Sequence, residues 1–146
     1  MHCFRAGAGR PLLLLHGLGG SWKSWGPVLD GLVASRDVIA PDLPGFGATP
    51  ALQGETSIRT LADAVTEFLR KNRLLGIDAV GSSMGGRLVL ELARRDVIGT
   101  AVALGPGGFW RGWQRHFFYA SMAASIKVVR MTVTVPPEAT RLRPMR

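Results

Sequence analysis

The sequence predicts an α/β fold in which a mostly parallel sheet is covered by helices on both faces. Short apolar runs alternate with longer segments of helical periodicity, an order typical of strands joined by crossover helices. Residues 12–15 are four consecutive leucines, as in a central strand that is buried on both faces. Three of the apolar runs end in glycine-containing turns, at the edge where parallel sheets place their ligands.

The expected elements follow one another in a regular order. Strands are expected at residues 3–5, 12–15, 38–40, 77–80 and 100–104. Helices are expected at residues 22–34, at 57–72, and from just after Ser83 to 95. Ser21 is the expected N-cap of the first helix. One stripe of the helix at 57–72 is apolar; it consists of Ile58, Leu61, Val65, Phe68 and Leu69.

A serine motif follows the fourth expected strand. Gly81-Ser82-Ser83-Met84-Gly85-Gly86 has the pattern G-x-S-x-G between strand and helix, which indicates a nucleophile elbow with Ser83 as the nucleophile. A Cβ at Gly81 or Gly85 would strike the adjoining strand or helix. The N–H of Met84, at the start of the helix, would face a developing oxyanion. The alternative is a glycine-rich helix start that merely packs closely.

A second glycine-rich turn follows the leucine strand. In His16-Gly17-Leu18-Gly19-Gly20 the N–H of Leu18 is the expected second oxyanion donor. We expect His16 to shape this turn rather than to act as a catalytic base. Asp42, in the Pro/Gly turn after the third strand, is expected to accept hydrogen bonds from backbone N–H groups of its loop and not to serve as a triad acid.

Together these motifs resemble the N-terminal part of an α/β-hydrolase of the esterase/lipase-like superfamily. The resemblance extends to about Gly108 and implies a partial fold whose C-terminal strands are missing. It implies that Ser83 is the nucleophile, with an oxyanion hole formed by Leu18 and Met84. It also implies hydrolysis of a carboxylic ester or a related acyl or carbon–carbon bond, whereas epoxide hydrolases and haloalkane dehalogenases use an aspartate at the elbow. The motif residues are His16, Gly17, Gly19, Asp42, Gly81 and Gly85. Histidine is common in relatives where Ser82 stands here.

The resemblance also implies a catalytic acid and histidine after the nucleophile. The carboxylates beyond Ser83 are Glu91, Asp96 and Glu138, and none stands at a position that matches the family's acid. The only histidine there is His116, in the segment that would begin the cap. We therefore expect weak or no activity from this chain alone. The rival interpretation is a non-catalytic half-domain that binds a ligand or partner, or a truncated relic.

The domain organisation is expected to change after residue 108. Residues 1–108 are expected to form the truncated core, 109–131 the start of a helical cap, and 132–146 an irregular tail. The apolar spacing within 109–131 would also suit a helix lying on a membrane surface. The strand at 100–104 would leave an open edge, which favours self-association or a complementing C-terminal polypeptide as partner.

Composition narrows the class of protein. Of the 146 residues, 18 are Lys or Arg and 10 are Asp or Glu, and most of the resulting +8 lies beyond residue 110, apart from any nucleic-acid motif. One cysteine suits a reducing compartment, so a cytoplasmic location is expected. No apolar run is long enough to span a bilayer. We expect a small-molecule substrate, no cofactor and no metal, because the three histidines are scattered.

Overall fold

The computed structural model describes residues 1–108, 112–114, 116–121 and 124. The chain divides into two compact units, Met1–Gly108 and Phe109–Arg146. The first unit contains the sheet, the helices that cover it, and every residue that we expected to take part in the site.

The sheet of the first unit has five strands in the order β1-β3-β2-β4-β5. The strands are β1 (Cys3–Ala6), β2 (Arg10–Leu15), β3 (Arg36–Pro41), β4 (Asp78–Ser82) and β5 (Ala101–Leu104). β1 pairs with β3 in the antiparallel sense, and all other neighbours are parallel. The mostly parallel sheet predicted from the sequence is therefore confirmed.

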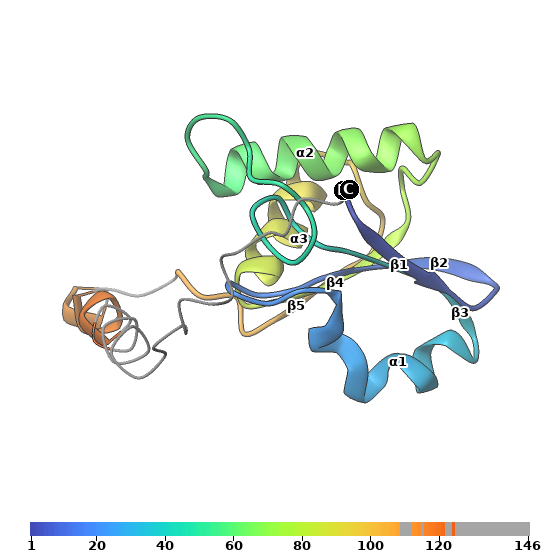
Figure 1. The fold of residues 1–146 in the computed structure, drawn as a ribbon, viewed down its shortest axis with the longest axis horizontal. Coiled ribbons are helices and arrows are strands. Elements are labelled where there is room, and N and C mark those ends of the chain that lie inside the picture. The colour runs from blue at the N-terminus through green and yellow to red at the C-terminus, as the bar shows by residue number, and fades with distance from the viewer. Residues whose placement is uncertain (109–111, 115, 122–123, 125–146) are drawn as a thin grey trace, which may run out of the picture. The chain divides into compact units, whose positions relative to one another are not determined.

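Helices cover both faces of this sheet, as predicted (Figure 1). On one face lies α1 (Gly26–Val33), preceded by a 3₁₀ turn, η1 (Trp22–Trp25). On the other face lie α2 (Ile58–Lys71) and α3 (Met84–Arg94). The single helix expected at 22–34 is thus divided. Pro27 has no N–H to donate to Lys23, and the N–H of Gly26 bonds the Lys23 carbonyl instead, which closes a tighter turn.

The core has two halves, one on each face of the sheet. Successive side chains of β2 point to opposite faces. Leu13 and Leu15 pack with α2 and α3, whereas Leu12 and Leu14 pack with α1. The burial of all four leucines explains why this strand is apolar without a break.

A serine side chain caps the start of two of the three expected helical segments. The Ser21 hydroxyl accepts from the N–H of Lys23 at the start of η1. The Ser57 hydroxyl accepts from the N–H of Thr60, and the Thr60 hydroxyl accepts from the N–H of Ser57, which forms a capping box before α2. The buried positions of α2 include three members of the predicted stripe, Leu61, Val65 and Leu69.

In the second unit, residues 116–121 are helical. The rings of Trp113 and Phe117 meet edge to face, with their centroids 6.3 Å apart. The expected irregular tail at 132–146 and most of the expected cap segment lie outside the described residues, so the assignment of this unit as a cap stays a prediction. Within the described part of the chain, no helix is long and apolar enough to cross a membrane.

Candidate functional site

The candidate site lies where β2 and β4 end side by side. These two strands are parallel neighbours, and Leu15 stands opposite Gly81 in their register. The loops that begin at His16 and at Ser82 therefore leave the same edge of the sheet from adjacent positions. The two motifs that the sequence analysis selected, 65 residues apart along the chain, meet at this point.

Ser83 occupies a strained turn between β4 and α3. Its φ of 52° and ψ of −112° place a non-glycine residue in a region that L-amino acids rarely adopt. The residue is exposed, and it is the N-cap of α3. Its backbone is held on both sides, because its N–H donates to the carbonyl of Leu104 (2.8 Å) and its carbonyl accepts from the N–H of Arg87 (3.1 Å).

The glycines beside Ser83 allow backbone to touch backbone. A Cβ added at Gly81 would overlap the carbonyl of Gly85, where strand and helix cross. A Cβ added at Gly85 would overlap the carbonyl of Leu15 on the neighbouring strand. Both positions therefore exclude every residue larger than glycine, and this close approach allows α3 to start immediately after Ser83.

The loop after β2 lies directly against Ser83. A Cβ added at Gly17 would lie 3.3 Å from Ser83 Cβ and 3.9 Å from Ser83 Oγ, so Gly17 faces the serine side chain at close range. The next residue, Leu18, has 59% of its surface exposed, and Gly19 follows with a φ of 73°. The turn that contains Leu18 therefore begins next to the Ser83 side chain.

His16 is buried and bonded at both ring nitrogens. Its Nε2 accepts from the N–H of Leu43 (3.0 Å), so the proton resides on Nδ1, which donates to the carbonyl of Gly17 (2.8 Å). The imidazole is 1% exposed and its ring contacts Phe46 edge to face. The ring therefore joins the turn after β2 to the turn after β3, and neither nitrogen is available to Ser83.

Asp42 organises the loop after β3. The carboxylate is 2% exposed and accepts from the backbone N–H groups of Trp22 (2.8 Å) and Ala48 (2.9 Å) and from Nδ1 of His2 (2.9 Å). Burial works to raise the pKa of this carboxyl, but the hydrogen bonds from the two N–H groups and the imidazole outweigh it and hold the pKa of Asp42 below its ordinary value.

Sequence reasoning did not identify His2, Thr49 or Leu104. The N–H of His2 donates to the Thr49 hydroxyl (2.9 Å), which fastens the N-terminus beside the Asp42 loop. The carbonyl of Leu104 holds the N–H of Ser83. These hydrogen bonds join segments far apart in the chain, and no local sequence pattern predicts them.

Two other carboxylates of the first unit, Glu91 and Asp78, form ion pairs away from Ser83. Glu91 pairs with Arg94 and Arg95, and these hydrogen bonds lower the pKa of its carboxyl to about 2. Asp78 pairs with Arg36 (2.6 Å) at the first residue of β4, the end of the strand opposite to Ser83. None of the described residues donates to or accepts from the Ser83 hydroxyl. No described group of three His, Cys, Asp or Glu side chains could share a metal ion.

A hollow of about 530 Å³ lies away from Ser83, between β1 and α2, and Cys3 lines it together with Phe68 and Leu74. Burial raises the pKa of the Cys3 thiol to about 11. The thiol is therefore protonated at neutral pH and is a poor nucleophile. Cys3 is therefore not an alternative nucleophile to Ser83.

Comparison with known proteins finds one matching family model and several relatives that are named hydrolases. A family model described as "alpha/beta hydrolase fold" matches residues 10–129. The chain is 35% identical over 100 residues to a soluble epoxide hydrolase of Corynebacterium sp. strain C12, covering 67% of this chain and 35% of the relative. It is 39% identical over 97 residues to 2-hydroxy-6-oxo-2,4-heptadienoate hydrolase of Pseudomonas putida F1, covering 61% of this chain and 34% of the relative.

A solved structure titled "Marine microorganism esterase" superposes with a TM-score of 0.74 at 23% identity, covering 97% of this chain and 53% of the esterase. At that level of identity the likeness concerns the fold. The chain spans about a third of the length of the two curated relatives named above.

Proposed function

Because the chain belongs to the alpha/beta hydrolase fold family, we propose that it carries the nucleophile and the oxyanion hole of a serine hydrolase. Ser83 is the nucleophile, and the bond it attacks is a carboxylic ester or a related acyl or carbon–carbon bond. The observation that supports this most strongly is the approach of two loops: Gly17 closely faces the side chain of a serine that is exposed and strained at the start of α3.

In the proposed mechanism the Ser83 Oγ adds to the carbonyl carbon of the substrate. The carbonyl oxygen becomes an oxyanion and accepts hydrogen bonds from the backbone N–H groups of Leu18 and Met84. Met84 opens α3, so the unpaired N–H groups and positive dipole end of the helix favour this negative charge. Each such donor contributes about a hundredfold to a thousandfold to the rate. The Ser83 proton passes to solvent water. The tetrahedral intermediate then collapses and expels the alcohol or carbon leaving group, which takes up a proton, and a water molecule hydrolyses the acyl-serine to release the acid.

The remaining motif residues shape the two turns. Gly81 and Gly85 permit the close approach at the elbow, and Gly17 and Gly19 permit the turn after β2. We assign His16 to the same structural role, since both of its ring nitrogens hold backbone groups. A proton acceptor for Ser83 is not among its described neighbours. We therefore expect the chain by itself to retain only the contribution of the oxyanion hole and binding, about 10³–10⁴-fold over water.

The substrate class follows from the residue at the elbow and from the relatives. The two curated relatives are named an epoxide hydrolase and a 2-hydroxy-6-oxo-2,4-heptadienoate hydrolase. A serine at the elbow favours acyl transfer, because a serine ester is readily hydrolysed by water attacking its carbonyl. We therefore favour an ester or a carbon–carbon bond next to a carbonyl over an epoxide.

A fluorophosphonate probe tests this proposal. The probe phosphonylates a serine whose oxyanion site can hold the phosphonyl oxygen. We expect slow labelling that peptide mapping assigns to Ser83, loss of that label in Ser83→Ala, and its retention in the matched variant Ser82→Ala. Labelling spread over several serines, or unchanged in Ser83→Ala, would refute the assignment of the nucleophile. Labelling as fast as that of an ordinary serine hydrolase would refute the expectation of weak activity.

One observation favours a second candidate function, a partner-binding half-domain. β5 pairs with β4 on one side and stands at the end of the described sheet. Val102 and Leu104, on its α1-side face, are 45% and 48% exposed, whereas Ala101 and Ala103 of the same strand pack against the core. An exposed apolar edge of this kind accepts a further strand. The proposed occupant is a second copy of this chain or a complementing polypeptide of the same fold family.

A further inference from the structure

Arg87 lies one helical turn from Ser83. Its N–H donates to the Ser83 carbonyl (3.1 Å), and residues four apart lie on the same face of a helix. The residue is exposed in the first half of α3. The Arg87 backbone is therefore about one turn, ~6 Å along the axis, from the backbone of the proposed nucleophile.

The guanidinium is held at this edge of the sheet by the loop after β5. A Cβ added at Gly108 would lie 3.0 Å from Arg87 Cζ and 3.1 Å from Nε, so the guanidinium lies against the Gly108 backbone. Leu104, the strand residue just before this loop, accepts the hydrogen bond from the N–H of Ser83. Leu104 ends β5, so the loop runs from the candidate nucleophile to Arg87 along the first turn of α3.

Arg87 differs from most arginines of the first unit in having no acidic partner. Arg5, Arg36, Arg94 and Arg95 each pair with a carboxylate at 2.5–2.8 Å. Among the described residues, no ion pair or side-chain hydrogen bond of Arg87 occurs. A guanidinium that is unpaired, exposed and fixed beside a candidate nucleophile offers two parallel N–H donors to a carboxylate from outside the chain.

We propose that Arg87 determines specificity by binding a carboxylate of the substrate, so that the site prefers acyl compounds carrying an acid group a few atoms from the scissile carbonyl. This inference rests on the proposed function of Ser83. The carboxylate takes no part in bond breaking; it orients the acyl group over Ser83 Oγ. Because Arg87 is exposed, the attraction is screened, and we expect about a three- to fivefold gain in affinity at low ionic strength.

A binding experiment with two esters tests the inference without any need for turnover. The chain carrying Ser83→Ala is titrated with monomethyl glutarate, which is an anion, and with dimethyl glutarate, which is neutral. Amide chemical shifts of the ¹⁵N-labelled chain report binding at Gly17 and Met84. Three methylene groups separate the ester carbonyl from the carboxylate, a span comparable with one helical turn.

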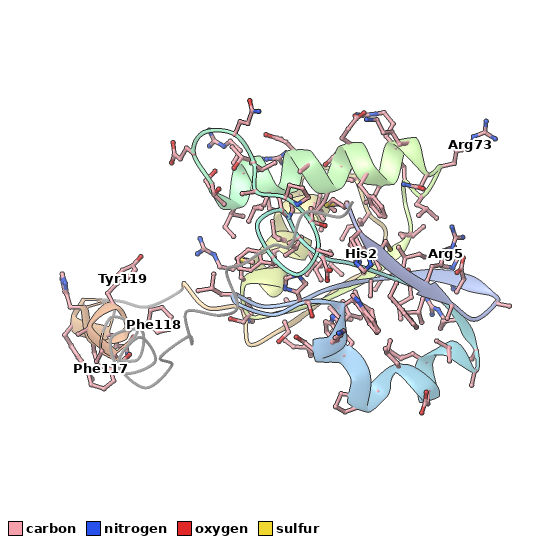
Figure 2. All side chains as sticks on the ribbon, in the orientation of Figure 1. His2, Arg5, Arg73, Phe117, Phe118 and Tyr119 are labelled. Carbon is pink, nitrogen blue, oxygen red and sulfur yellow. The ribbon has the colours of Figure 1, made fainter. Side chains whose placement is uncertain are left out.

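We expect the anionic ester to bind about three- to fivefold more tightly than the neutral one, with the difference shrinking as salt is added. The preference should vanish when Arg87→Gln is added and persist with Arg87→Lys. The matched control is Arg73→Gln, in the turn after α2, whose side chain points away from the ribbon (Figure 2). Arg73 is exposed, as Arg87 is, and the Arg73→Gln substitution should leave the preference for the anionic ester unchanged.

Three outcomes would overturn the inference: equal affinity for the two esters, a preference that survives Arg87→Gln, or no shift of either amide with the anionic ester. Failure of the proposed function is read separately. It would appear in the unsubstituted chain as probe labelling that does not map to Ser83. A chain that labels at Ser83 but shows no preference for the anionic ester would retain the proposed function and lose the role of Arg87.

Discussion

Ser83 shows how a single residue is forced into a reactive position by its neighbours. A positive φ at a non-glycine residue costs about 1–3 kcal/mol and persists only when the surroundings impose it. Here the surroundings are the Leu104 carbonyl, the first turn of α3 and the two glycines that admit neighbouring backbone. Contacts from β2, β5 and α3, which meet at this turn, thus hold Ser83 in its strained conformation.

Gly85→Ala should disrupt this arrangement. The new Cβ would overlap the Leu15 carbonyl, and neither β2 nor α3 can move without opening the core, so we expect a loss of roughly 3 kcal/mol or more of stability. Urea unfolding measures it. Gly31→Ala is the matched control, because that helical glycine of α1 has open space around it and should gain about 0.5–1 kcal/mol. Equal effects of the two substitutions would contradict the close packing at the elbow.

Asp42 should make stability depend on pH in the acid range. Its pKa is lower in the folded chain than the ordinary value of 3.8, so its contribution is present above that value and is lost as pH falls through the folded pKa. Asp42→Asn should cost about 1–3 kcal/mol at pH 7, because an amide cannot accept from all three donors. Below the folded pKa the difference between the two chains should shrink. A difference that grows on acidification would contradict this assignment.

At the scale of residues, the sequence predicted what a local pattern can encode. The strand-turn-helix order identifies Ser83, and unbroken leucines identify β2. The hydrogen-bond partners of the residues around the site could not be predicted in this way. The bond from Leu43 to His16 spans 27 residues and that from His2 to Asp42 spans 40, and each depends on which loops the sheet order places together. A sequence read without relatives contains no signal for such pairs.

At the scale of elements, β5 is the strand least covered by the rest of the first unit. α1 covers the face of the sheet formed by β2 and β3, whereas the same face of β5 exposes Val102 and Leu104. In β2 all four leucines are buried. The difference follows from position, because β2 is central and β5 is terminal in the sheet.

Leu104→Lys should therefore weaken self-association of the chain. A charge on an exposed edge strand opposes pairing with another strand. Sedimentation velocity at several concentrations should show a shift toward monomer. Leu75→Lys provides the control, since Leu75 is similarly exposed, at 51%, but lies in the turn before β4 and outside the edge. If the two variants associate alike, or if Leu104→Lys changes nothing, β5 is not the contact surface.

Element boundaries were predicted less well than element types. The helix expected at 57–72 is α2, Ile58–Lys71, so each of its ends lies within one residue of the expected position. The helix expected at 22–34 instead starts as a 3₁₀ turn, since Pro27 breaks the hydrogen-bond ladder. β4 continues through Ser82, two residues beyond its apolar run, because Gly81 and Ser82 pair with β5. Hydrogen-bonded pairing with the neighbouring strand therefore determines where β4 ends, and the apolar pattern of the sequence contains no information on that pairing.

At the scale of the whole molecule, the first unit brings one sheet edge, one helix start and two turns together. The order β3-β2-β4 makes the strands that precede His16 and Ser83 neighbours, although 67 residues separate these two positions. Alternation of strand and helix predicted the parallel sheet and its two covered faces. The second unit contributes little to this account, because most of it lies outside the described residues.

The central claim is that the N–H groups of Leu18 and Met84 converge on one point beside the Ser83 hydroxyl. A crystal structure of the chain with Ser83 phosphonylated tests it most directly. We predict a phosphonyl oxygen about 2.7–3.1 Å from both backbone nitrogens. An oxygen that turns toward solvent and meets neither nitrogen would contradict the claim.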